Sequence, residues 1–197
     1  MHRRVTIVLS GAGGVGKGAI ARRLIERDGQ LWLSRSWTSR ERRTDDAPDA
    51  YHYVSRDDFE AHRRDGGFLE WNEFSGNLYG TPVPHPPPGL DVLLEIDVNG
   101  GRQVRERDPD AVLIFVEAPT IEAQRARLIG RGESAQRAEE RITQGERERR
   151  DAQRLGYRFV VNDELETAVT EIAGMIDRAR RDRHERRDQA EETPSGA

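Results

Sequence analysis

Short apolar runs recur along the chain, each bounded by glycine, proline or charged residues. Five of these runs are typical of buried strands, and they cover residues 5–10, 31–33, 91–97, 111–116 and 158–161. Segments with apolar residues at helical spacing separate several of the runs, and they cover residues 19–26, 120–131 and 165–176. Strands alternating with helices predict an α/β fold, in which a parallel sheet carries helices on both faces. Ligands of such sheets bind at the carboxyl ends of the strands.

The pattern changes between the second and third of these strands. Residues 51–54 and 68–74 have the mixed polarity of exposed strands, and Ser55 is placed to cap a helix that begins at Arg56. We therefore expect an insert over residues 36–81. The proline-rich stretch that follows, residues 82–89, predicts a stiff connector that is neither helix nor central strand.

The carboxyl-terminal third is dominated by charged residues. Residues 131–154 favour a helix with few large apolar side chains, which either solvates itself or closes over a ligand. We expect a lid over residues 131–155, within a core made of residues 1–35 and 82–179. Residues 180–197 are charged and end in Thr-Pro-Ser-Gly-Ala, so we expect a disordered tail there.

One lysine stands apart from the other basic residues. Of 32 basic side chains 31 are arginine, and the single lysine, Lys17, lies in a glycine-rich loop between the first strand and the first helix. A lysine is a compact charge on a thin stem, which suits a loop wrapped around phosphates better than a guanidinium does. Strand, Gly-x-x-x-x-Gly-Lys and helix together predict a P-loop. The expected ATP-binding residues are Gly11, Ala12, Gly13, Gly14, Val15, Gly16, Lys17, Gly18 and Ala19.

A P-loop usually places a Ser or Thr hydroxyl on Mg²⁺ directly after the lysine. Here Gly18 and Ala19 have no hydroxyl. We therefore expect one of two arrangements: the Mg²⁺ that accompanies ATP is held by phosphates, by water and by Asp97, or it is held poorly.

Bulk composition excludes several classes of protein. The net charge of −4 argues against general nucleic-acid binding, and the lack of cysteine excludes disulfides and thiolate metal sites. No apolar stretch approaches the roughly 20 residues of a membrane span, and the strand-like segment at residue 5 leaves no room for a signal peptide. We expect a cytoplasmic protein without membrane or nucleic-acid partners; its oligomeric state stays open.

Several further motifs follow one another along the chain. Together with the P-loop they are Ser36-Trp37-Thr38-Ser39-Arg40 with Arg43, Phe68-Leu69-Glu70-Trp71 with Asn77-Leu78-Tyr79-Gly80-Thr81, residues 91–100, residues 127–132, and Val161-Asn162-Asp163. In this order they resemble the guanylate kinase family, over about residues 5–176. The resemblance implies a P-loop NTPase fold: a three-layer αβα parallel sheet with a GMP-binding insert and a helical lid. It also implies transfer of the γ-phosphate of MgATP to GMP, giving GDP and ADP.

The resemblance implies a role for each matching residue. Arg40, Arg43, Tyr51 and Tyr79 would hold the GMP phosphate, because guanidinium forks and phenol hydroxyls suit a dianion. The guanine would be recognised by Ser36, Glu70, Thr81 and Glu95, since a carboxylate accepts from two adjacent guanine donors and repels adenine. Asp97 would border the GMP site and order the Mg²⁺ shell through water. Catalysis would involve Lys17, Arg40, Asp97 and the lid arginines Arg131 and Arg141, with Asn162 and Asp163 near the adenine of ATP.

Two alternatives stay open at this point. A guanylate-kinase-like binding module that has lost catalysis would explain the missing hydroxyls at positions 18 and 19. A related P-loop kinase for a phosphorylated sugar would need the phosphate-binding residues but not Glu70.

Overall fold

The protein contains two sheets in one α/β architecture. The structure, a computed structural model, describes residues 4–42, 46, 48, 50–74 and 76–192. The strands are β1 Thr6–Gly11, β2 Leu31–Ser34, β3 Trp37–Thr38, β4 His52–Tyr53, β5 Phe68–Phe74, β6 Asn77–Pro82, β7 Asp91–Glu95, β8 Val112–Glu117 and β9 Arg158–Val161. The helices are α1 Lys17–Arg27, α2 Arg56–Arg64, α3 Val98–Arg107, α4 Ile121–Gly130, α5 Ala135–Arg154 and α6 Leu165–Glu192.

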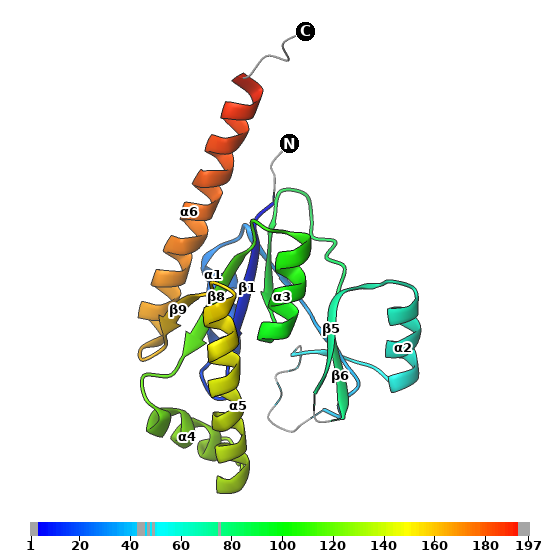
Figure 1. Ribbon diagram of the computed structural model, residues 1–197, viewed down its shortest axis with the longest axis vertical. Coiled ribbons are helices and arrows are strands. Elements are labelled where there is room, and N and C mark those ends of the chain that lie inside the picture. The colour runs from blue at the N-terminus through cyan, green and yellow to red at the C-terminus, as the bar shows by residue number, and fades with distance from the viewer. Residues whose placement is uncertain (1–3, 43–45, 47, 49, 75, 193–197) are drawn as a thin grey trace.

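The central sheet is parallel and has β1 in its middle. Its strand order is β2-β7-β1-β8-β9, and all of its pairs are parallel. The predicted α/β class is therefore confirmed. Because the strands point the same way, the loop after β1 and the residues after β7 and β9 meet at one edge of the sheet. Helices α4 and α5 reach this edge, where Figure 1 shows them below the ends of the strands.

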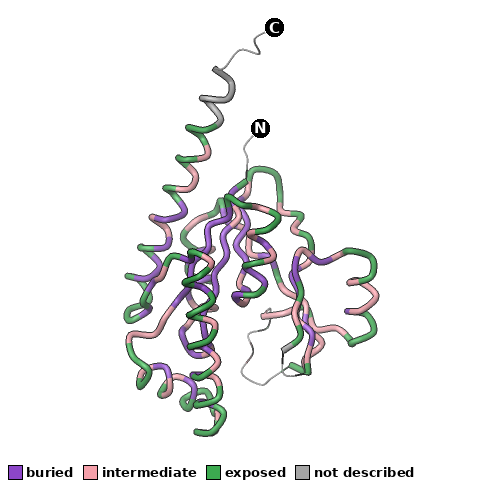
Figure 2. The backbone as a smooth tube through the Cα atoms, in the orientation of Figure 1, coloured by how far each residue is buried: buried purple, intermediate pink, exposed green. Residues whose placement is uncertain are grey.

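Alternating side chains build a core on each face of this sheet. Ile7 and Leu9 of β1 belong to a cluster with α1 and α6, whereas Val8 belongs to a cluster with α3 and α5. A strand alternates the direction of its side chains, so one apolar run serves both layers. Figure 2 shows the resulting buried strands between more exposed helices. The five strands are continuous apolar runs in the sequence because both faces of this sheet are buried.

The second sheet, beside the core, is built from the residues around the predicted insert. Its order is β4-β3-β6-β5, and β5 and β6 form an antiparallel hairpin. Helix α2 packs on it through Phe59, which contacts Phe68 and Leu78. The structure confirms Ser55 as the cap of α2, since its side chain accepts from the Asp58 backbone N–H. This layer lies on the α3 side of the core (Figure 1).

The predicted tail is wrong over most of its length. Helix α6 does not end near residue 176 but continues to Glu192. Arg180 makes ion pairs with Asp28 at 2.8 Å and with the buried Asp91 at 2.7 Å. Arg183 pairs with Asp108 at 3.4 Å. A run of arginines and carboxylates looks like a solvated tail in the sequence, but here several of its arginines are held by aspartates of the core.

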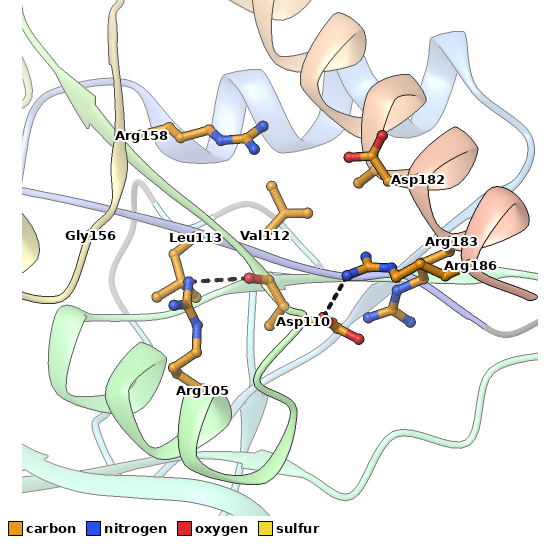
Figure 3. Close-up of a pocket in the computed structure, with 11 residues that line it drawn as sticks. Arg105, Asp110, Val112, Leu113, Gly156, Arg158, Asp182, Arg183 and Arg186 are labelled. Carbon is orange, nitrogen blue, oxygen red and sulfur yellow. Dashed lines mark hydrogen bonds and ion pairs between the residues drawn. The ribbon is translucent and has the colours of Figure 1, made fainter. Parts of the chain in front are cut away.

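Arg183 also lines a cleft of about 190 Å³ at the amino ends of β8 and β9 (Figure 3). Arg158 lies across this cleft from Asp182, and Arg186 pairs with Asp110 at 3.3 Å. The cleft lies at the opposite end of the sheet from the loop after β1, so it is separate from the predicted nucleotide site. Among the described residues, no helix combines the length and the apolar character that crossing a membrane requires.

Candidate active site

The loop after β1 has the backbone of a phosphate-binding turn. Gly14 and Gly16 have φ angles of 82° and 95°, in the left-handed region that glycine tolerates best. A Cβ on Gly16 would lie 2.5 Å from Asn162 Nδ2, and one on Gly14 would lie 2.9 Å from Leu128 Cγ. Both glycines are therefore required by conformation and by the close approach of neighbouring elements.

The amino terminus of α1 is left open to an anion. Gly16 caps the helix and makes no side-chain hydrogen bond, and the first turn contains no acidic residue. The helix therefore presents its N–H groups and the positive end of its dipole without a carboxylate that would compete for them.

Lys17 lies inside the loop, as the sequence predicts. Its Nζ donates to the carbonyl oxygens of Gly11 at 2.5 Å and Ala12 at 3.2 Å. Burial lowers the pKa of Lys17, and the carboxylates of Glu95 and Glu148 act against this shift. The ammonium is therefore held where phosphate oxygens of a nucleotide would replace the carbonyl partners.

Three carboxylates surround the lysine from different elements. Glu95 ends β7, Asp97 caps α3, and Glu148 belongs to α5. Burial raises the pKa of Glu95, while Lys17 lowers it, and burial also raises the pKa of Glu148. A Cβ on Gly18 would lie 3.6 Å from Glu95 Oε2, which places this carboxylate beside the position that lacks a hydroxyl.

The predicted lid packs against the phosphate loop. A Cβ on Gly13 would lie 2.7 Å from Arg141 Nη1. Gln124 of α4, which precedes the predicted lid, donates to the Gly13 carbonyl at 2.8 Å. Arg141 pairs with Glu133 at 3.2 Å. Arg131 follows α4 and lies near enough to Glu95 for its charge to lower the pKa of that carboxyl. Arg141 thus lies against the loop, whereas Arg131 lies near Glu95.

The β5–β6 hairpin gathers four polar side chains on one face. Glu70 pairs with Thr81, and Asn72 pairs with Tyr79, so all four point the same way. A bulge between Phe68 and Glu70 shifts the register and lets Phe68 turn into the apolar cluster on the other side. The bulge thereby separates the core of the insert from its polar face.

Glu70 lies at the centre of a small buried group. Its side chain is 5% exposed, and Thr81 donates to it from both its hydroxyl and its backbone N–H. Burial raises the pKa of Glu70 to about 7, against these two hydrogen bonds. The Ser36 hydroxyl lies 3.3 Å from that of Thr81. The structure therefore brings together three of the four residues predicted for guanine, while Glu95 lies toward Lys17.

A second cluster forms around Arg40. Its guanidinium lies 5.6 Å from the centre of the Tyr51 ring and pairs with Asp46 at 2.9 Å. Tyr51 and Tyr79 are in edge contact, and burial raises the pKa of Tyr51 to about 12. Three of the four predicted phosphate ligands thus lie together. The fourth, Arg43, lies outside the described residues.

Asn162 has a clear structural contact. Its buried amide donates to the Val15 carbonyl at 2.8 Å, and its backbone carbonyl accepts from Arg127 at 3.0 Å. It therefore supports the turn of the phosphate loop from the end of β9. Its contact with ATP stays a prediction, as does that of Asp163.

Sequence reasoning missed three polar residues of this region: Asp46, Asn72 and Glu148. Asp46 and Glu148 lie in segments rich in charge, where no spacing distinguishes one carboxylate from its neighbours. Asn72 could have been found, because it follows Glu70 by two residues and so shares its face of the strand.

Comparisons with known proteins agree with this arrangement. The guanylate kinase family model matches residues 3–179, which is most of the chain. The chain belongs to the guanylate kinase family. The guanylate kinase of Synechococcus sp. (strain CC9311) is 42% identical over 171 residues, covering 84% of this chain and 90% of that protein. A guanylate kinase of Thermus thermophilus is 41% identical over 180 residues, covering 88% of this chain and 81% of that protein.

The fold agrees with the same family. The crystal structure of guanylate kinase from Anaplasma phagocytophilum has a TM-score of 0.67 and 26% identity, and it covers 91% of this chain and 88% of that one. The resemblance drawn from the motifs and the P-loop NTPase fold are thus confirmed. Guanylate kinases are phosphotransferases, and the chain carries the lysine and the phosphate loop of such an enzyme.

Proposed function

We propose that the protein transfers the γ-phosphoryl group of MgATP to GMP, with the residues of the site in the following roles. The observation that carries the choice of GMP is the buried Glu70 beside Thr81 and Ser36. Guanine offers its N1–H and 2-amino group as adjacent donors, and a carboxylate accepts from both. Adenine presents an acceptor at the same edge, which would leave the carboxylate buried and unpaired.

The donor nucleotide would bind at the phosphate loop. The free amino end of α1 and the loop N–H groups suit the β- and γ-phosphates. Lys17 would exchange its contacts with Gly11 and Ala12 for phosphate oxygens. Arg141, which already lies over Gly13, and Arg131 would counter the charge that develops during transfer.

The acceptor phosphate would bind between Arg40, Tyr51 and Tyr79, with Arg43 as a further ligand. Because its pKa is about 12, Tyr51 keeps its proton at neutral pH and can donate to a phosphate oxygen. The attacking group is already a phosphate oxygen, so the reaction needs alignment and charge stabilisation more than an acid or a base.

The residues present suit Mg²⁺ bound together with ATP. Mg²⁺ keeps several waters and usually takes one or two carboxylates plus substrate phosphates. The described residues contain no group of three His, Asp or Glu that could hold a metal by itself, whereas Asp97 at the edge of the loop suits this shared mode. When bound, Mg²⁺ would neutralise phosphate charge during transfer.

The most direct test of the guanine assignment is Glu70→Gln. The amide has an N–H₂ where guanine also has donors, so we expect kcat/KM for GMP to fall by at least about 100-fold, with ATP binding unchanged. The matched control is Glu73→Gln, since Glu73 lies on the same strand, half exposed and paired with Arg56. Unchanged GMP turnover in Glu70→Gln would exclude Glu70 as the residue that recognises guanine.

The same variant gives a pH test. The carboxylate form accepts from guanine, so kcat/KM for GMP should fall as the pH drops below about 7, the pKa of Glu70 in the free protein. This limb of the profile should be absent in Glu70→Gln. A limb that persists unchanged in the variant would assign the titration to another group.

One observation favours a binding module as a second candidate. Gly18 and Ala19 provide no hydroxyl to the metal. A module of that kind would bind GMP at Glu70 and Arg40 but would form no ADP or GDP, so a single turnover with radiolabelled ATP separates the two functions. The sugar-phosphate kinase is less favoured, because its substrate has no base that the buried Glu70 and Thr81 could bind.

A further inference from the structure

Asp97 is held by two hydrogen bonds from opposite sides. Its Oδ1 accepts from the Gly100 backbone N–H at 2.7 Å, which is the cap of α3. Its Oδ2 accepts from Asn72 Nδ2 at 2.8 Å. The first bond is local to the core, whereas the second comes from strand β5 of the neighbouring sheet, 25 residues away in the chain.

The hydrogen bond from Asn72 differs from the other contacts between β5 and α3. Gln103 donates to the Trp71 carbonyl at 3.1 Å, and Arg107 donates to the Phe68 carbonyl at 3.4 Å. These two bonds end on the backbone of β5 and attach the strand to the helix. Of the three, only the bond from Asn72 ends on a carboxylate of the candidate active site.

The position of Asn72 links two halves of the site. It lies on the same face of the hairpin as Glu70, and its partner across the ladder is Tyr79. The strand that carries Glu70, predicted to bind GMP, therefore also fixes the side chain that is predicted to order the metal shell. A one-residue shift of β5 would move Glu70 and Asn72 together.

We propose that Asn72 is a positioning residue that orients Asp97 toward the bound magnesium–nucleotide. This inference rests on the proposed function of Asp97. A carboxylate has about four acceptor sites, so two fixed donors set its plane and leave other lone pairs for water of a metal shell. Because Gly18 and Ala19 supply no hydroxyl, the orientation of Asp97 matters more here than in a loop that binds the metal directly.

The arrangement also predicts coupling between the two substrates. If bound GMP restricts the motion of the β5–β6 hairpin, the hydrogen bond from Asn72 restricts Asp97 as well. The magnesium–nucleotide then binds more tightly. Coupling between two binding sites is reciprocal, so the magnesium–nucleotide should tighten GMP by the same factor. Without the Asn72 amide, the two ligands should bind more independently.

The experiment measures ADP binding by calorimetry in saturating Mg²⁺ and in EDTA, for the wild type, Asn72→Ala, Asp97→Asn and the control Gln103→Ala. The dissociation constant of ADP in EDTA, divided by that in Mg²⁺, measures how much the metal tightens nucleotide binding. We expect Asn72→Ala to reduce this ratio by about tenfold, a typical effect of losing a residue that orients a metal-site ligand. Binding of metal-free ADP should change by less than about twofold, as should the dissociation constant of GMP in the absence of the magnesium–nucleotide, since the coupling through Asn72 requires both ligands.

The outcomes separate the two claims. A reduced ratio in Asn72→Ala and Asp97→Asn, with the wild-type ratio in Gln103→Ala, supports the inference. An equal reduction in Gln103→Ala would make the effect one of general docking between β5 and α3 and would overturn it. A wild-type ratio in Asn72→Ala alone overturns the role of Asn72 and leaves the proposed function intact. A wild-type ratio in Asp97→Asn overturns the proposed role of Asp97 itself.

Discussion

Single side chains at the phosphate loop show how strictly geometry selects residue type. The protein uses arginine at 31 of its 32 basic positions, yet it keeps lysine where Nζ lies within hydrogen-bonding distance of the Gly11 and Ala12 carbonyls. A guanidinium is wider and carries its five donors in a rigid fork. We therefore expect the loop to hold an ammonium together with phosphate oxygens, but not a guanidinium fork in the same place.

Lys17→Arg tests this steric argument. We expect kcat to fall by at least about 100-fold despite the retained charge, because the fork displaces the phosphates from the loop. The control is Arg23→Lys, the reverse exchange on the exposed face of the same helix, where the ion pairs with Glu26 and Glu166 contribute little. Near-normal kcat in Lys17→Arg, with the fold intact by circular dichroism, would show that charge alone matters at this position.

At the same scale, the residues that could be predicted are those that belong to ordered motifs. Lys17, Glu70 and Arg40 occur at set spacings in the sequence from glycines or aromatic residues. Their ligand groups could therefore be named before the fold was known. Asp46 could not be predicted in this way, because its role depends on a loop bringing it to Arg40. A carboxylate among arginines gives no signal until the tertiary contact is formed.

At the scale of elements, helix α3 shows why local propensity misleads. The apolar pattern predicts no element over residues 98–110, and the structure has a helix there. Adjacent glycines in the first turns weaken the helical pattern. The fold requires them, because a Cβ on Gly100 would lie 2.6 Å from Glu70 Oε2, and one on Gly101 would overlap the Tyr157 hydroxyl. Packing against the site and the core therefore outweighs propensity.

Gly101→Ala measures this conflict directly. Alanine gains about 1 kcal/mol of helix propensity, but the overlap with Tyr157 should cost about 1–3 kcal/mol. We expect a net loss of stability, seen as a lower urea midpoint. The control is Gly130→Ala in α4, where a Cβ has no atom within 4 Å and should stabilise the protein. A higher midpoint for Gly101→Ala would show that the interface between α3 and Tyr157 can accommodate a Cβ at position 101.

At the scale of the whole molecule, the layers are easier to predict from the sequence than the lengths of the outer elements. Buried strands and the P-loop specify a parallel sheet whose ligands bind at one edge, and the structure has that sheet. Helix α6 is longer than its apolar pattern because Arg180 and Arg183 pair with aspartates far away in the chain. Such pairs depend on the assembled fold and leave no periodic signal in the sequence.

The assembled molecule places two candidate ligand regions near each other. One is the loop after β1 with α4 and α5, and the other is the polar face of the β5–β6 hairpin. Asp97 accepts a hydrogen bond from Asn72 of the hairpin, and its charge acts to raise the pKa of Lys17 in the loop. This arrangement is suited to the proposed in-line transfer between two bound nucleotides. The central claim is therefore a phosphotransfer that selects GMP.

The measurement that tests this claim most directly is ADP formation from MgATP in a coupled assay, with GMP, AMP, CMP and UMP offered in turn. We predict turnover with GMP, and rates for the other three that are lower by at least about 100-fold, because only guanine satisfies the buried Glu70. The Lys17→Arg variant, expected to be inactive, provides the background rate. Equal turnover of all four nucleotides, or none with any while GMP still binds, would contradict a phosphotransfer that selects GMP.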